Sequence, residues 1–424
     1  VSHLQFMKLS QNALGGVVTV SVAAVTVLSM IALQYVIPEK KSGLTPRFNE
    51  DGTVYSTSRS STVDMYASVA SSVKAGCPED DQPCLEKAIL DMTDSSGPEI
   101  SIRTLTLLVN EGVMHGRGDY HDYVHRIGRL TAKKEGLNPD GFFRCPVDYN
   151  YGCQHGFFEQ ALVEEPDAVK AAEIVCDTTR MADKPLKFLF YCYHGVGHGV
   201  MMAKAYDLDA SLEVCDGFAD TSQQGGCQQG VFMESVVGHM NGTARQDDVF
   251  SEEDRIAPCN RLEARFQYQC YINLGGYLAA SGGKGPGAVE RATEPCLKAD
   301  PANIRPCIVS VGLTSTNPGW QQALTPNFTD DPINNAAQIC DHFPEGYKDE
   351  CVDAGIQNLA QFHRDDTTLM VQFCLAVDEE FRSMCFTRIG SIVRDEVPAG
   401  TPAEHICAGI PEEYRSLCIQ GAKS

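Results

Sequence analysis

Apolar residues along most of this chain recur every three to four positions, which is the spacing of one face of an α-helix. Residues 100–113 carry this pattern, and residues 168–175 repeat it directly after Pro166 and Asp167, a typical helix start. No stretch alternates apolar and polar residues for long enough to indicate a sheet. The pattern therefore predicts an all-α fold.

One stretch near the start is apolar without periodicity. Residues 13–37 carry no charge, and 25 residues are enough to cross a hydrocarbon core of about 30 Å. Pro38 follows where a cleavable signal peptide would have a small-residue cleavage site. We expect a short tail at 1–12, an uncleaved transmembrane signal-anchor helix at 13–37 and a flexible stalk at 38–61.

The orientation of this span depends on two signals that disagree. Lys8 stands alone before the span, whereas Lys40, Lys41 and Arg47 follow it, which by the charge rule places the C-terminal side in the cytoplasm. The 18 cysteines, none in a Cys-x-x-Cys pair, indicate an oxidising compartment instead. We follow the cysteines and predict a single-pass protein of the cell membrane, with its C-terminal domain extracytoplasmic.

The cysteines fall into successive pairs along the chain. The last five pairs share the spacing Cys-x10-Cys, and from Cys176 onward the first cysteines recur every 33 to 44 residues. This period is typical of helical hairpins that stack on their neighbours to bury an apolar face. We expect a disulfide-stapled helical-hairpin repeat array, an α-solenoid. The predicted bonds are 77–84, 145–153, 176–192, 215–227, 259–270, 296–307, 340–351, 374–385 and 407–418.

The repeats divide into two groups by their histidine content. Residues 62–245 form the predicted N-terminal repeats, which contain most of the histidines, and residues 246–424 form the C-terminal repeats with Cys-x10-Cys spacing. A glycine follows the second cysteine of most repeats in both groups, so we attribute it to helix packing. Gly197 and Gly199 lie outside this repeat pattern and have no such explanation.

Histidines and glutamates recur at helical spacing in the N-terminal repeats. His121 and His125 are four residues apart, as are His194 and His198, so each pair shares one helix face with its Cβ atoms about 6 Å apart. Segment 153–159 aligns with segment 227–234, where Gln229 replaces the histidine. Stacking would bring equivalent faces together. The predicted metal ligands are His121, His125, His155, His194 and His198, and the predicted catalytic proton carriers are Glu159 and Glu234.

Imidazole and carboxylate groups suit a transition-metal ion such as zinc, iron or copper. If the site is catalytic, metal-activated water with a glutamate as proton carrier is the simplest mechanism, and oxidation at iron or copper is the other. The signatures of common zinc proteases, serine hydrolases and phosphate-binding loops are missing from the sequence. A transition-metal centre, with or without catalysis, is the first interpretation.

Two alternatives stay open from the sequence. The histidines could serve only to hydrogen-bond turns at helix interfaces. The protein could also be a non-catalytic cell-surface scaffold for a protein, peptide or glycan, which the later repeats, 259–421, favour because they lack a histidine group. The net charge of −22 makes a nucleic-acid partner unfavourable. The predicted partners are therefore the membrane, through residues 13–37, and an extracellular protein or glycan.

Overall fold

The computed structural model describes residues 61–115, 120–180, 184, 187–242, 249–325, 327–362, 367–398 and 400–424. These residues belong to one compact unit and contain helices but no strand, which confirms the all-α prediction. The predicted tail, transmembrane helix and stalk lie outside the described residues, except for Ser61, the first residue of α2. Among the helices that are described, none is both long and apolar enough to span a membrane.

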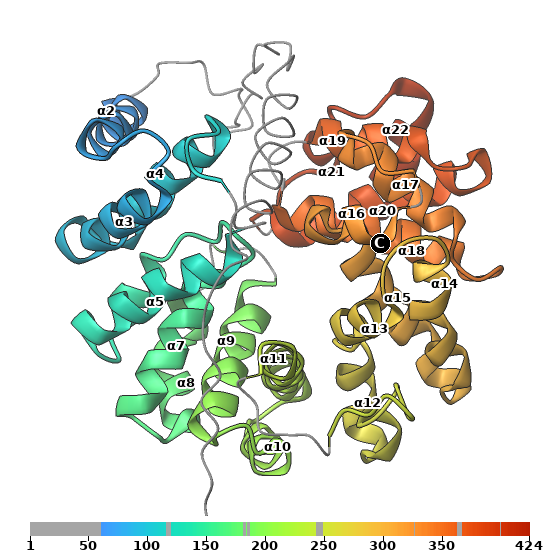
Figure 1. Cartoon of the computed structure of the whole chain (residues 1–424), viewed down its shortest axis with the longest axis horizontal. Helices are drawn as coiled ribbons and strands as arrows, with labels where there is room; N and C mark the ends of the chain where they lie inside the picture. Colours follow the sequence, from blue (N-terminus) through green and yellow to red (C-terminus); the bar gives the residue numbers. More distant parts are fainter. Residues whose placement is uncertain are drawn as a thin grey trace, which may run out of the picture. The chain divides into compact units, whose positions relative to one another are not determined.

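One series of helices forms a continuous stack in which each member packs on the next (Figure 1). From α7 onward each repeat contributes one of these helices, in most cases the helix that contains the second cysteine. The stack consists of α5 (His121–Glu135), α7 (Gly152–Glu164), α9 (Phe188–Ala203), α11 (Thr221–Met240), α13 (Gly275–Gly282), α15 (Pro301–Thr316), α18 (Lys348–Phe362), α20 (Glu379–Glu396) and α22 (Glu412–Lys423).

Three further helices precede the stack, and two of them pack against its first member. They are α2 (Ser61–Gly76), α3 (Gln82–Ser96) and α4 (Pro98–Asn110), and α3 and α4 both contact α5. Further helices, most of them short, connect the stacked ones. These are α6 (Pro139–Phe143), α8 (Ala168–Val175), η1 (Thr178–Arg180), α10 (Leu208–Asp216), η2 (Cys259–Arg261), α12 (Ala264–Tyr271), α14 (Ala288–Thr293), η3 (Glu294–Lys298), α16 (Pro318–Leu324), α17 (Pro332–Asp341), α19 (Thr367–Ala376) and α21 (Ala403–Ile406).

Aspartates define where several connecting helices begin. Asp167 accepts a hydrogen bond from the backbone N–H of Lys170 at 3.1 Å, and Asp207 accepts one from Ala210 at 3.0 Å. Such a cap satisfies an N–H that has no partner inside the helix and is worth about 1 kcal/mol. The helix start predicted at residues 166–168 is therefore confirmed.

The nine predicted disulfides are all present in the described chain, and no free cysteine remains in it. Cys340, near the end of α17, is bonded to Cys351 in α18, with the two Cα atoms 5.3 Å apart. Closing a loop of this size in the unfolded chain stabilises the fold by about 3 kcal/mol in the chain-entropy model. Nine disulfides indicate an extracellular or secreted domain.

Buried apolar side chains form two clusters. One extends from Ala70 to Cys153, and the other continues along the stack from Ala132 to Ala422. The second cluster crosses residue 245, so apolar side chains from both groups of repeats belong to it. The division of the domain at residues 245 and 246 stays a prediction.

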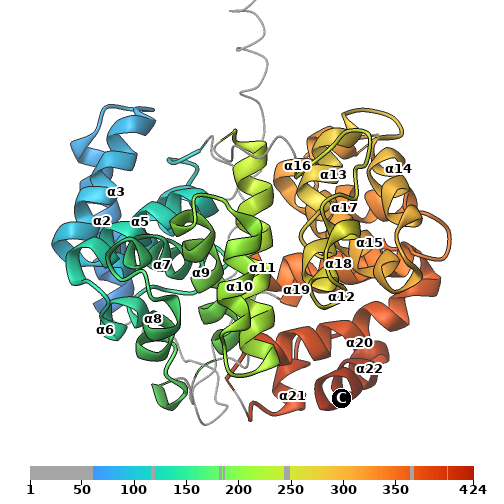
Figure 2. The same cartoon turned by 90° about the horizontal axis from the view of Figure 1, so that it is seen from below.

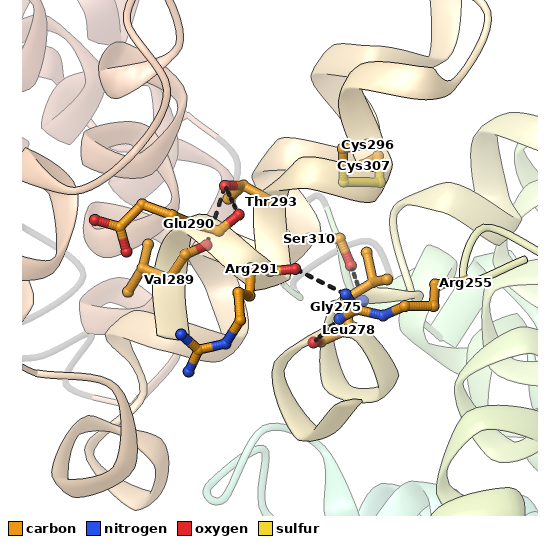
Figure 3. Close-up of a disulfide and its surroundings, with 10 residues drawn as sticks. All are labelled: Arg255, Gly275, Leu278, Val289, Glu290, Arg291, Thr293, Cys296, Cys307 and Ser310. Carbon is orange, nitrogen blue, oxygen red and sulfur yellow. Dashed lines mark hydrogen bonds between the residues drawn. A yellow bond between two sulfur atoms is a disulfide. The ribbon is translucent and has the colours of Figure 1, made fainter. Parts of the chain in front are cut away.

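The repeat glycines lie where backbones of neighbouring helices meet. A Cβ atom on Gly275, at the start of α13, would overlap the backbone carbonyl oxygen of Ser310 in α15. Figure 3 shows this contact beside the Cys296–Cys307 disulfide, with the Gly275 N–H donating to Ser310 Oγ at 2.6 Å. This repeat has no histidine in the cluster, so its glycine serves helix packing, as the sequence indicated.

Candidate metal centre

Four consecutive helices of the stack bring seven histidines and glutamates together. Figures 1 and 2 both show α5, α7, α9 and α11 side by side in this order. All seven side chains are buried except His121, which is half-buried. We call them the histidine cluster. It consists of His121 and His125 of α5, His155 and Glu159 of α7, His194 and His198 of α9, and Glu234 of α11.

The glycines of α9 explain how this helix reaches both of its neighbours. A Cβ atom on Gly199 would lie 2.6 Å from the carbonyl oxygen of Phe158 in α7, and one on Gly197 would overlap that of Cys227 in α11. Each glycine in a helix interior lowers helix stability by about 0.8–1.0 kcal/mol relative to alanine. The close packing that these two glycines allow offsets this cost. The same approach positions His194 and His198 against the adjacent helices.

The histidine pair of α5 is held by acceptors on its Nδ1 atoms. His121 Nδ1 lies 2.7 Å from the backbone oxygen of Tyr149, and His125 Nδ1 lies 2.6 Å from Glu159 Oε1. Arg129 donates to the other carboxylate oxygen of Glu159. The two Nε2 atoms of the pair face each other at 2.9 Å.

The histidine pair of α9 repeats this arrangement. His194 Nδ1 lies 3.1 Å from the amide oxygen of Gln229, and His198 Nδ1 lies 3.0 Å from Glu234 Oε2. Tyr206 donates its hydroxyl to the other oxygen of Glu234 at 2.7 Å. Again the two Nε2 atoms face each other, at 3.1 Å.

The acceptors determine which ring nitrogen carries the proton. Backbone, amide and carboxylate oxygens only accept, so every Nδ1 atom in the two pairs must donate its N–H. In a neutral imidazole the Nε2 atom then carries a lone pair, and each pair holds two lone pairs about 3 Å apart. Such a contact requires a positive charge between the nitrogens, either a proton or a metal ion.

His155 of α7 has no hydrogen-bond partner on either ring nitrogen, although it is only 1% exposed. Leaving a buried polar atom unpaired costs about 1–3 kcal/mol. Its ring centroid lies 4.8 Å from those of both His194 and His198, 5.3 Å from that of His125 and 5.5 Å from that of His121. Histidines of both pairs therefore surround it.

Burial and neighbouring charges shift the pKa values within the cluster. Burial, followed by the surrounding histidines, holds the pKa of His155 and of His194 well below the ordinary value. Burial lowers the pKa of His125, but the charge and hydrogen bond of Glu159 raise it more. Burial also raises the pKa of Glu159, while His125 and Arg129 lower it more, so this carboxylate is ionised. His155 and His194 are thus disposed toward the neutral form, close to an anionic Glu159 carboxylate.

The cluster contains three groups of side chains that could hold a metal ion. They are His121 with His125 and His155, His155 with His194 and His198, and Glu159 with His198 and Glu234, each with ligand atoms within 4.8 Å of one another. Zinc–nitrogen bonds of about 2.0–2.1 Å place two ligands of a tetrahedral ion about 3.3 Å apart, close to the observed Nε2 separations. In known metal sites, a histidine that binds the ion through one ring nitrogen commonly donates its other ring N–H to a carboxylate.

No protein-family model, no curated protein and no solved structure matches this chain. Its function must therefore be inferred from the chemistry of its own side chains.

All seven side chains predicted from the sequence lie in the histidine cluster. Their roles as ligands or proton carriers stay predictions. His239 belongs to the same histidine-rich stretch, yet its ring packs 4.6 Å from that of Phe250 and 5.6 Å from that of Tyr277.

Sequence reasoning missed the outer partners of the cluster. Arg129 follows His125 by one helical turn, so its spacing could have indicated it, and Gln229 was noticed only as a replacement for histidine. Tyr149 contributes a backbone oxygen, for which no side-chain pattern exists. Tyr206 lies in a turn whose position only the fold determines.

Proposed function

We propose that this protein is an extracytoplasmic transition-metal-binding protein whose histidine cluster is the binding site. One observation supports the proposal most strongly. In both helix pairs the Nδ1 atoms donate to oxygen acceptors, while the Nε2 lone pairs face each other at 2.9 and 3.1 Å. A metal ion between the lone pairs converts each repulsive contact into two bonds.

The donor set favours zinc, copper or iron among the metals available to proteins. Imidazole nitrogen suits these ions, whereas calcium and magnesium prefer oxygen ligands. A proton shared by each pair is the competing explanation for the short contacts. It leaves both nitrogens of the buried His155 without a partner, so it accounts for less of the structure.

The contacts of the two glutamates favour a role in orienting the metal-binding histidines over a role in proton transfer. Glu159 accepts from His125 and Arg129, and Glu234 accepts from His198 and Tyr206, so each carboxylate has both oxygens engaged. Such contacts hold an imidazole in one orientation and raise its basicity. The role of Glu159 and Glu234 as proton carriers in a metal-dependent reaction stays a prediction.

Metal analysis of the purified protein tests the proposal. The full chain, oxidised and prepared without chelators or a histidine tag, should contain one or two transition-metal ions per molecule. Replacing both His194 and His198 by glutamine should lower the metal content while the disulfides and the helical circular dichroism remain. His239→Gln is the matched control, because His239 lies outside the cluster and should not affect metal content.

The opposite result would be a correctly oxidised protein that contains no metal and whose thermal unfolding does not respond to added zinc, copper or iron. In that case the histidines serve helix packing, and a shared proton explains the short Nε2 contacts.

We also propose that the stacked helices form an α-solenoid and that residues 13–37 attach it to a membrane. The ordered packing from α5 to α22 and the nine disulfides support the first part. The uncharged apolar run supports the second. Carbonate extraction of membranes should leave the full chain in the pellet, and replacing Leu28 by arginine should release it.

A further inference from the structure

His155 is the one histidine of the cluster with neither ring nitrogen hydrogen-bonded. It also belongs to two of the three candidate metal groups, one with His121 and His125 and the other with His194 and His198. Its helix, α7, packs against α5 on one side and α9 on the other. A single imidazole therefore adjoins two histidine pairs that come from different helices, and the pairs also meet each other, with the ring centroids of His125 and His198 5.7 Å apart.

We propose that His155 bridges two metal ions as an imidazolate, with one ion bound by the pair of α5 and the other by the pair of α9. This inference rests on the proposed metal-binding function and specifies the form of the site. The two nitrogens of one imidazole ring point in opposite directions, so each can bind a different ion. The bridge therefore gives a partner to both nitrogens that the protein itself leaves unpaired.

The protons of the bridge can be followed from the free to the bound protein. A neutral His155 offers one lone pair and one N–H. The first ion binds the lone pair, and the second ion takes the place of the remaining ring proton, which passes to solvent. Metal binding of this kind releases a proton without any oxidation or reduction.

The charges of the surrounding side chains suit two divalent ions. Two such ions bring four positive charges, and the imidazolate offsets one. Glu159 and Glu234 offset two more through the histidines that they orient, and Arg129 on Glu159 adds one positive charge; both carboxylates are almost fully buried. The two similar arrangements, one on α5 and α7 and one on α9 and α11, thus provide an equivalent set of groups for each ion.

Copper titration followed by electron paramagnetic resonance tests the bridge in the full chain. The first Cu²⁺ should give the signal of an isolated ion. The second should decrease the integrated signal toward zero, because an imidazolate couples the two unpaired electrons. In His155→Gln two copper ions should give the full signal of two uncoupled ions. Glutamine already occupies the aligned position 229, which makes it the conservative replacement. His239→Gln should behave like the unchanged protein.

The possible outcomes separate this inference from the proposed function. Binding of no copper would contradict both. Binding of a single ion, or of two ions whose signals add in full, would overturn the bridge and leave the metal-binding function standing. If His155→Gln does not fold, the titration of the unchanged protein still decides, since the loss of signal with the second ion is specific to a coupled pair.

Discussion

In each imidazole of the two histidine pairs, the two ring nitrogens have different roles. Nδ1 is fixed by an oxygen acceptor, such as Glu159 for His125, and Nε2 is thereby directed toward the paired histidine. The acceptor selects the tautomer before any ion arrives, so an ion meets lone pairs that are already oriented. Preorganisation of this kind makes the outer residues as informative as the ligands.

Replacing Glu159 by glutamine tests this orientation at a single residue. The amide oxygen can still accept from His125, but the negative charge is lost, and we expect zinc affinity to fall by about 10- to 100-fold. Isothermal titration calorimetry measures the change. Glu164→Gln is the control on the same helix, because Glu164 is exposed at the end of α7. Equal affinities of the two variants would show that the buried carboxylate does not support the site.

Acidification of the metal-free protein gives a second test at this scale. The pKa of His155 is depressed in the folded protein by burial and by His121, His125, His194 and His198, so the unfolded chain binds more protons at acidic pH. The stabilising effect of a neutral His155 is present above about pH 6.5 and is lost as the pH falls below it. Urea unfolding of the chelated protein should show less acid destabilisation in His155→Gln. An identical pH dependence would contradict this account.

At the scale of helices, glycines determine how closely the stack can pack. Gly128 of α5 lies against α7, and Gly156 of α7 lies against α5. In the same way, Gly197 of α9 lies against α11, and Gly230 of α11 lies against α9. In each case an added Cβ atom would overlap a backbone oxygen of the neighbouring helix, which cannot move aside like a side chain. The two histidine pairs thus lie on the two most closely crossing helix pairs of the cluster.

Gly197→Ala should separate α9 from α11. We expect it to lower the free energy of unfolding by about 1–3 kcal/mol, since overpacking forces backbone shifts. Gly76→Ala, at the end of α2, is the control, because nothing lies within 4 Å of its added Cβ atom. Urea unfolding of the oxidised proteins compares them, and metal content should also fall in Gly197→Ala alone. Equal stability of the two variants would contradict the close-packing explanation.

For the whole molecule, the sequence predicts the repeated helices and their sequential disulfides well. Both follow from local spacing, as the pair Cys340 and Cys351 illustrates. The grouping of His155 with the histidine pairs also follows, because equivalent positions of stacked repeats become neighbours. The sequence could not show that Tyr206 reaches Glu234 or that His239 packs beside Phe250, because Tyr206 and Phe250 lie outside the helices, in segments whose positions only the fold determines.

The side chains that could bind a metal ion lie in only one part of the stack. The histidine cluster uses only α5, α7, α9 and α11, whereas the later described repeats keep the disulfides and close glycine contacts without a comparable group. The disulfides therefore stabilise the whole array, and the side chains that could hold a metal ion lie in one part of it. Loss of metal should leave the later repeats folded.

X-ray absorption at the metal K-edge, on the zinc-loaded full chain after removal of excess zinc, tests the central claim most directly. The histidine cluster predicts a first shell dominated by imidazole nitrogens at about 2.0–2.1 Å, with the outer-ring scattering typical of histidine. This signal should disappear when His121, His125, His194 and His198 are all replaced. Retained zinc surrounded only by oxygen, or no retained zinc at all, would contradict the account.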